Sequence, residues 1–133
     1  MSESMDHISL VKKIIAYINK QNNNFLILSD SHAAQSSPSR TSNIHGYVPD
    51  VMAFNPEMDC IYLGEAKTKN DLERRHTEDQ VKTFLSYCSQ KNIVFIIAVP
   101  WDLKRLAVSL LKMWQSEICL NYEKTIVIDC TYE

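Results

Sequence analysis

Three charged residues stand at the ends of two neighbouring apolar runs in this chain of 133 residues. Asp50 lies at the start of the first run, and Glu65 and Lys67 lie at the end of the second. Between the runs, Asn-Pro-Glu-Met at 55–58 predicts a turn, because proline cannot donate to a strand ladder and asparagine before proline favours turns. We therefore predict an antiparallel hairpin of two strands, 47–54 and 59–67.

The hairpin determines how these charged side chains face. Side chains on a strand alternate between two faces, so Glu65 and Lys67 point the same way and Ala66 points away. Counting back from the turn places Asp50 roughly opposite Glu65. Two carboxylates and an ammonium are thus predicted to converge at one end of a sheet.

Carboxylates that lie this close repel each other, and each resists ionisation. A divalent cation such as Mg²⁺, which takes oxygen ligands, relieves that repulsion. Such a cation can activate water and neutralise charge on a phosphodiester, and Lys67 could orient or deprotonate the water or stabilise the developing charge. The alternative is that Glu65 and Lys67 form a surface ion pair and Asp50 is a turn residue.

Two segments carry a family resemblance: Val48-Pro49-Asp50-Val51 and Leu63-Gly64-Glu65-Ala66-Lys67-Thr68. Together they resemble the signature of the PD-(D/E)xK nucleases, which include restriction endonucleases and Holliday junction resolvases. The resemblance covers roughly residues 6–99 and implies a Mg²⁺-dependent nuclease, with Mn²⁺ as a substitute and DNA as substrate. It implies that the Asp50 and Glu65 carboxylates and the Ala66 carbonyl bind the metal, and that Lys67 assists the attacking water.

Gln80 is a further candidate on the helix after these strands. Several members of the superfamily place a glutamine there, and RecB-like members continue with a Gln-xxx-Tyr pattern. Here Phe84 stands in place of that tyrosine, which leaves the RecB-like subgroup open. The other interpretation is that Gln80 closes a capping box that begins at Thr77. Both interpretations can hold together.

Some members also use a glutamate of the first helix as a metal ligand. This chain has no glutamate between Glu3 and Glu57. We therefore expect no ligand from the first helix, with Glu3, Asp6 or His7 as the alternatives.

Basic residues near the predicted site are candidates for contacts to DNA phosphates, which dominate nucleic-acid affinity. They are Lys69, Arg74, Arg75 and, in the polar loop 29–46, Arg40. Acidic neighbours dilute the cluster, so a solvated loop is the alternative. The net charge of −2 argues against a broad basic surface and for a contact that is local, metal-assisted or shared by two subunits. We predict that Trp101 and Trp114 serve packing and not base stacking.

Apolar periodicity predicts the remaining elements. We expect helices at 6–20, from Thr77 and from Pro100–Asp102 onward, and strands at 25–28, 92–99 and 125–129. Leu103, Leu106, Ala107, Leu110, Leu111 and Trp114 are the predicted inner face of the last helix. The fold class is α/β, with a restriction-endonuclease-like core and a mixed central sheet of about five strands flanked by helices.

Composition sets the broader expectations. Hydrophobic residues make up 45% of the chain, no apolar run suits a membrane span, and no basic-then-apolar leader is present. We expect one domain over 1–133 in the cytoplasm. The four cysteines lack zinc-site spacing and are predicted to be reduced structural thiols. Because duplex cleavage needs two cuts, we also expect a homodimer through residues 101–122, with a protein partner for specificity as a further option.

Overall fold

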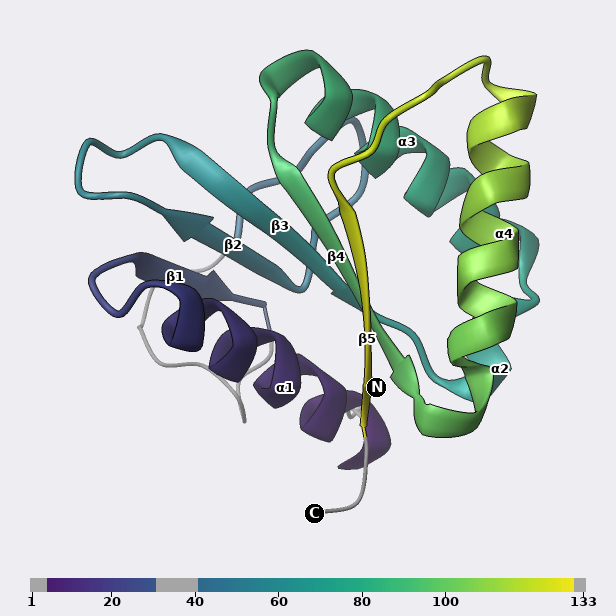
Figure 1. Cartoon of the computed structure of the whole chain (residues 1–133), viewed down its shortest axis with the longest axis horizontal. Coiled ribbons are helices and arrows are strands. Elements are labelled where there is room, and N and C mark those ends of the chain that lie inside the picture. The colour runs from purple at the N-terminus through teal and green to yellow at the C-terminus, as the bar shows by residue number, and fades with distance from the viewer. Residues whose placement is uncertain (1–4, 31–40, 131–133) are drawn as a thin grey trace.

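The computed structural model describes residues 5–30 and 41–130, which form a sheet flanked by helices (Figure 1). The helices are α1 (Met5–Gln21), α2 (Lys69–Leu72), α3 (Arg75–Lys91), the 3₁₀ turn η1 (Trp101–Leu103) and α4 (Lys104–Glu117). The strands are β1 (Leu26–Ser29), β2 (Val51–Phe54), β3 (Cys60–Ala66), β4 (Val94–Pro100) and β5 (Thr125–Cys130).

The described strands form one five-stranded mixed sheet in the order β1-β2-β3-β4-β5. The pairs β1–β2 and β2–β3 are antiparallel, whereas β3–β4 and β4–β5 are parallel. The predicted α/β class, the mixed sheet and the antiparallel hairpin are all confirmed. Because β3 and β4 are parallel, both strands end on the same side of the sheet. Strand β2 runs antiparallel to β3, so Asp50, which directly precedes β2, lies on that same side.

Helices cover both faces of the sheet (Figure 1). The apolar stripe of α1, including Val11, Ile14 and Ile18, packs on one face with Val51 and Ile96. Helices α3 and α4 cover the other face, where fully buried side chains fill the core: Leu63, Phe84, Leu85, Phe95 and Ile97. Alternation along β3 therefore turns Leu63, and with it Glu65 and Lys67, toward the α3 side.

Gly64 allows α1 to approach the strand that carries Glu65. A Cβ atom at Gly64 would lie 2.8 Å from Ile14 Cγ2 and 3.4 Å from Val51 Cβ. Ile14 is itself fully buried, so it has little room to move away. A larger residue at position 64 would therefore clash with α1, which explains why a glycine directly precedes Glu65.

Several boundaries differ from the sequence predictions. Helix α3 begins at Arg75 with Arg74 as N-cap, so the capping box predicted at Thr77 is wrong, and Thr77 lies buried within the helix. A capping box does occur earlier, where Thr68 and Asp71 bond each other's backbone and side chain at the start of α2. That short helix was not predicted, because a four-residue segment gives no apolar period.

Two other expectations need correction. The strand predicted from Tyr47 starts only at Val51, and Tyr47 makes an isolated bridge with Ile44. Leu106, predicted on the inner face of the last helix, is 36% exposed, whereas Ala107, Leu111 and Trp114 are buried as predicted. The inner face is narrower because α4 packs at the margin of the sheet against β5 and α3.

Across the residues that the structure describes, no helix is long and apolar enough to cross a membrane. Of the cysteines, Cys60, Cys88 and Cys119 are free thiols, as predicted. Cys119 is exposed and so does not have the structural role expected of it.

Candidate active site

At the end of the β2–β3 hairpin, the carboxylates of Asp50 and Glu65 each accept a hydrogen bond from the backbone of the opposite strand. The register Val51–Gly64, extended by one residue, places Asp50 opposite Glu65, as the sequence predicted. The Asp50 N–H donates to Glu65 Oε1 at 3.0 Å, and the Ala66 N–H donates to Asp50 Oδ2 at 2.9 Å. Each carboxylate thus accepts a backbone hydrogen bond from the opposite strand where the ladder ends.

The backbone on the other side of Asp50 is also held. Its carbonyl accepts a hydrogen bond from the Asp30 N–H at 3.0 Å, which continues the β1 pairing. The Pro49 carbonyl accepts one at 2.6 Å from the hydroxyl of Thr41, a buried residue of the preceding loop. These bonds fix the backbone from which the Asp50 side chain projects.

Lys67 reaches from the end of β3 to both Glu65 and helix α3. Its Nζ lies 3.3 Å from Glu65 Oε2 and donates a hydrogen bond to Gln80 Oε1. The Lys67 N–H bonds the Ala98 carbonyl at 2.9 Å, which anchors the residue to β4. Gln80 lies beyond the first turn of α3 and contacts Lys67, so the structure joins it to the three charged residues and not to a cap.

Burial makes it costly for the carboxylates of this cluster to carry a negative charge. Glu65 is 2% exposed, and Lys67 and Gln80 are also buried, whereas the side chain of Asp50 keeps 13% of its surface. Burial, and then the neighbouring Asp50 carboxylate, raise the pKa of Glu65 well above its ordinary value, and Lys67 opposes that shift. The site therefore favours an additional positive charge, either a proton or a cation.

The donor groups suit a hard cation. Two carboxylates from adjacent strands supply oxygens, the ligands that Mg²⁺ and Mn²⁺ accept. In a strand the N–H and C=O of one residue face the same neighbour, so the Ala66 carbonyl faces β2 as its N–H does. One oxygen of each carboxylate, Asp50 Oδ2 and Glu65 Oε1, accepts a backbone hydrogen bond, and these oxygens keep further lone pairs. The residues present thus fit a metal held by few protein ligands and completed by water.

His7 also reaches this cluster, from the first turn of α1. Its Nε2 lies 3.2 Å from Asp50 Oδ2. Helix α1 therefore does contribute a side chain beside Asp50, although we expected no ligand from it. The sequence signal was only a histidine early in the first helix, and nothing in the sequence shows that the helix crosses the sheet at Asp50.

The predicted phosphate-binding residues lie outside this cluster. Lys69 stands in α2 just after β3, and Arg74 and Arg75 stand at the start of α3; all three are exposed. Asp71 is engaged with Thr68 at the α2 capping box. Arg40 lies outside the described residues.

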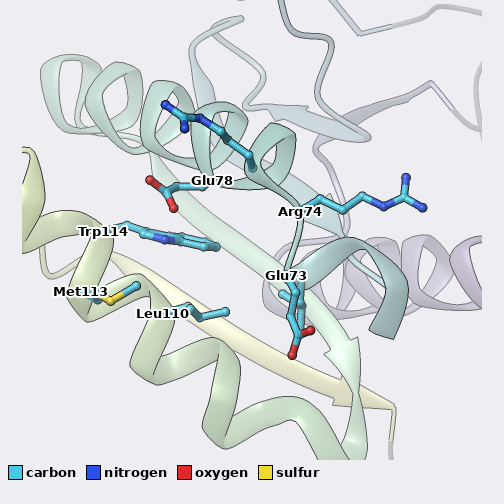
Figure 2. A pocket seen from close by; sticks show the side chains of 8 residues that line it. Glu73, Arg74, Glu78, Leu110, Met113 and Trp114 are labelled. Carbon is cyan, nitrogen blue, oxygen red and sulfur yellow. The ribbon is translucent and has the colours of Figure 1, made fainter.

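The two tryptophans differ. Trp114 is buried, as predicted, and with Leu110 and Met113 it lines a cavity of about 340 Å³ between α4 and the start of α3 (Figure 2). Among the described residues its Nε1 has no hydrogen-bond partner in ideal geometry, but Glu78 lies beside the indole, and the contact with Trp114 is one of the smaller causes that lower the pKa of Glu78. Asp50, Glu65 and Lys67 do not line this cavity. Trp101 is 57% exposed, so its predicted packing role is wrong.

Within 5–30 and 41–130, no three His, Cys, Asp or Glu side chains gather closely enough to hold a metal ion. A metal at this site would therefore depend on two carboxylates together with backbone and water oxygens. No model of a known protein family, no curated protein and no solved structure matches this chain.

Proposed function

We propose that this protein is a divalent-metal-dependent nuclease of the PD-(D/E)xK type that hydrolyses phosphodiester bonds of DNA, as an endonuclease. One observation carries the proposal: Asp50, Glu65 and Lys67 meet at one end of an antiparallel hairpin. Each carboxylate accepts a backbone hydrogen bond from the opposite strand, and Lys67 lies beside Glu65. The order of helix, three strands, helix and strand also agrees with the core that the sequence resemblance implies.

Asp50 and Glu65 are the proposed ligands of Mg²⁺ or Mn²⁺, together with the Ala66 carbonyl. When bound, the metal supplies a Lewis acid that neutralises charge on the phosphodiester and lowers the pKa of water. Glu65 must give up its proton to act as a ligand, because its raised pKa favours the neutral form. His7 of α1 contacts the Asp50 carboxylate and would help to orient it.

Lys67 is the proposed group that acts on the attacking water or on the scissile phosphate. An ammonium has three N–H donors. Contacts to Glu65 and Gln80 use two of them among the described residues, which leaves one for an oxygen of the water or the phosphate. Gln80 is therefore a positioning residue, because it acts through Lys67. Lys69, Arg74 and Arg75 are proposed to hold neighbouring phosphates.

The test is a cleavage assay on a panel of linear, circular, branched and single-stranded DNA. We expect cleavage with Mg²⁺ or Mn²⁺, none with chelator, and restoration of cleavage when metal is added back. The panel also reports whether ends are needed, which separates endonuclease from exonuclease action. Absence of cleavage on every substrate with both metals would contradict the proposal.

An interaction protein that keeps this fold without catalysis is the second candidate. It is favoured by the absence, among the described residues, of a three-residue acidic or histidine cluster, and by the net charge of −2. Calorimetry separates the two candidates, since an accessory protein should take up no Mg²⁺ or Mn²⁺ at Asp50 and Glu65.

Assembly into a homodimer is a further part of the proposal. The outer side of α4 exposes Leu106 and Met113, with Leu110 half-buried between them, and such a stripe suits a symmetric contact. Light scattering at micromolar concentration, with and without DNA, should give twice the mass of 15.4 kDa. A monomer in both conditions would contradict this part.

A further inference from the structure

Trp101 stands at the same edge of the sheet as the proposed site. Strands β3 and β4 are parallel, and Trp101 follows directly after Pro100, the last residue of β4, just as Lys67 follows directly after Ala66, the last residue of β3. The Lys67 N–H donates to the Ala98 carbonyl at 2.9 Å, so Lys67 lies beside the strand residue that precedes Trp101 by three positions. A nucleic acid bound at Lys67 would therefore pass close to this tryptophan.

The indole is available to a ligand. Trp101 is 57% exposed and makes no ring contact with another aromatic residue in the described ranges. The aromatic rings of Tyr47 and His76 differ from Trp101, because they pack on each other at 5.5 Å and Tyr47 also contacts Phe84. Those rings already have protein partners.

The charges around Trp101 suit a polyanion. Lys104 and Arg105 follow it by three and four residues, which places them on the same side of the turn that opens α4, and both are exposed. Asp102 is the only acidic residue of the sequence between 101 and 116. Lys69 follows the end of β3 by three residues, so exposed basic residues follow the ends of both β3 and β4.

We propose that Trp101, with Lys104 and Arg105, binds an unpaired nucleotide of DNA next to the cleavage site. This inference rests on the proposed nuclease function and names its substrate class as DNA with a single-stranded segment. An indole stacks on any base, whereas the bases inside a duplex are already stacked on both sides. The basic side chains hold the phosphates that flank the stacked base.

The test measures binding without cleavage. A labelled single-stranded DNA oligonucleotide, its blunt duplex and an RNA of the same sequence are titrated in chelator with the parent, Trp101→Ala and Trp101→Phe. Trp101→Ala removes the surface on which one base stacks and should weaken single-strand binding by about 10-fold. Trp101→Phe keeps a ring and should stay close to the parent, and binding of the duplex should change little in either variant.

Tryptophan fluorescence locates the contact. The chain has two tryptophans, and the buried Trp114 should not respond. We expect the single strand to quench emission of the parent and not of Trp101→Phe. Met58→Ala is the control, since Met58 is exposed in the hairpin turn at the opposite end of β3.

Three results would overturn the inference. They are unchanged single-strand affinity in Trp101→Ala, equal losses for single strand and duplex, and binding of RNA without binding of DNA. Failure of the nuclease proposal would look different. If the nuclease proposal alone is wrong, binding that depends on Trp101 persists but no substrate is cut. If the stacking proposal alone is wrong, cleavage depends on metal but Trp101→Ala has no effect on binding.

Discussion

Asp50→Ala should abolish both divalent-metal binding and DNA cleavage. The substitution removes one of the two carboxylates that can hold a cation, and the buried Glu65 then remains as the only carboxylate of the pair. Loss of the Asp50 charge lowers the pKa of Glu65, but a single carboxylate is a weak site for a divalent cation. Glu65→Ala should have the same outcome from the other side of the hairpin. Calorimetric titration with Mg²⁺ and Mn²⁺, paired with a plasmid cleavage assay on the same samples, measures both effects.

Asp50→Asn is the matched variant that separates charge from structure. Its amide oxygen can still accept the Ala66 N–H bond, which in Asp50→Ala is left without its acceptor. We therefore expect Asp50→Asn to melt close to the parent and yet to bind no metal. Glu57→Gln, in the exposed hairpin turn, should change neither property. Metal binding that survives in Asp50→Asn would remove Asp50 from the ligand set.

Lys67→Ala should leave metal binding in place and lower the cleavage rate by about 10²-fold or more, the scale of losing acid–base or electrostatic assistance. The division of labour explains the difference, because the carboxylates hold the cation and the ammonium acts on the water or phosphate. Loss of Lys67 removes a repelling charge beside the cation, but it also makes ionisation of Glu65 harder. These two effects on metal affinity oppose each other.

The fold should tolerate the loss of Lys67, because Glu65 can remain protonated when its partner is missing. Lys67→Met keeps most of the volume of the side chain and checks that any loss of rate does not come from a cavity. Lys91→Ala, exposed at the far end of α3, is the control for a general loss of positive charge. A Lys67→Ala protein that cuts as fast as the parent would favour the interaction-protein alternative.

The antiparallel hairpin could be predicted because its determinants are local. Apolar runs and the turn at 55–58 set the pairing, and the two-residue period of a strand sets the face of Glu65 and Lys67. Helix α1 and strand β4 were predicted for the same reason, since each carries a long apolar pattern. Boundaries that depend on capping, such as the start of α3 at Arg75, were predicted less well because several polar segments could form the cap.

The sequence by itself predicted that Asp50 lies roughly opposite Glu65 and that Glu65 and Lys67 share a face, because the turn sets the pairing to within about a residue and strand alternation sets the face. The exact register depends on an irregularity between Ala53 and Phe54, which shifts the pairing by one residue and brings Asp50 level with Glu65. Only the tertiary structure decided what surrounds them. Gln80 bonds Lys67 because α3 packs across the end of β3, and His7 reaches Asp50 because α1 crosses the opposite face. Trp101 is exposed because β4 ends at the sheet edge before α4 turns back. Those contacts join segments far apart in the chain, and their positions follow from how helices pack on the sheet, which no local pattern encodes.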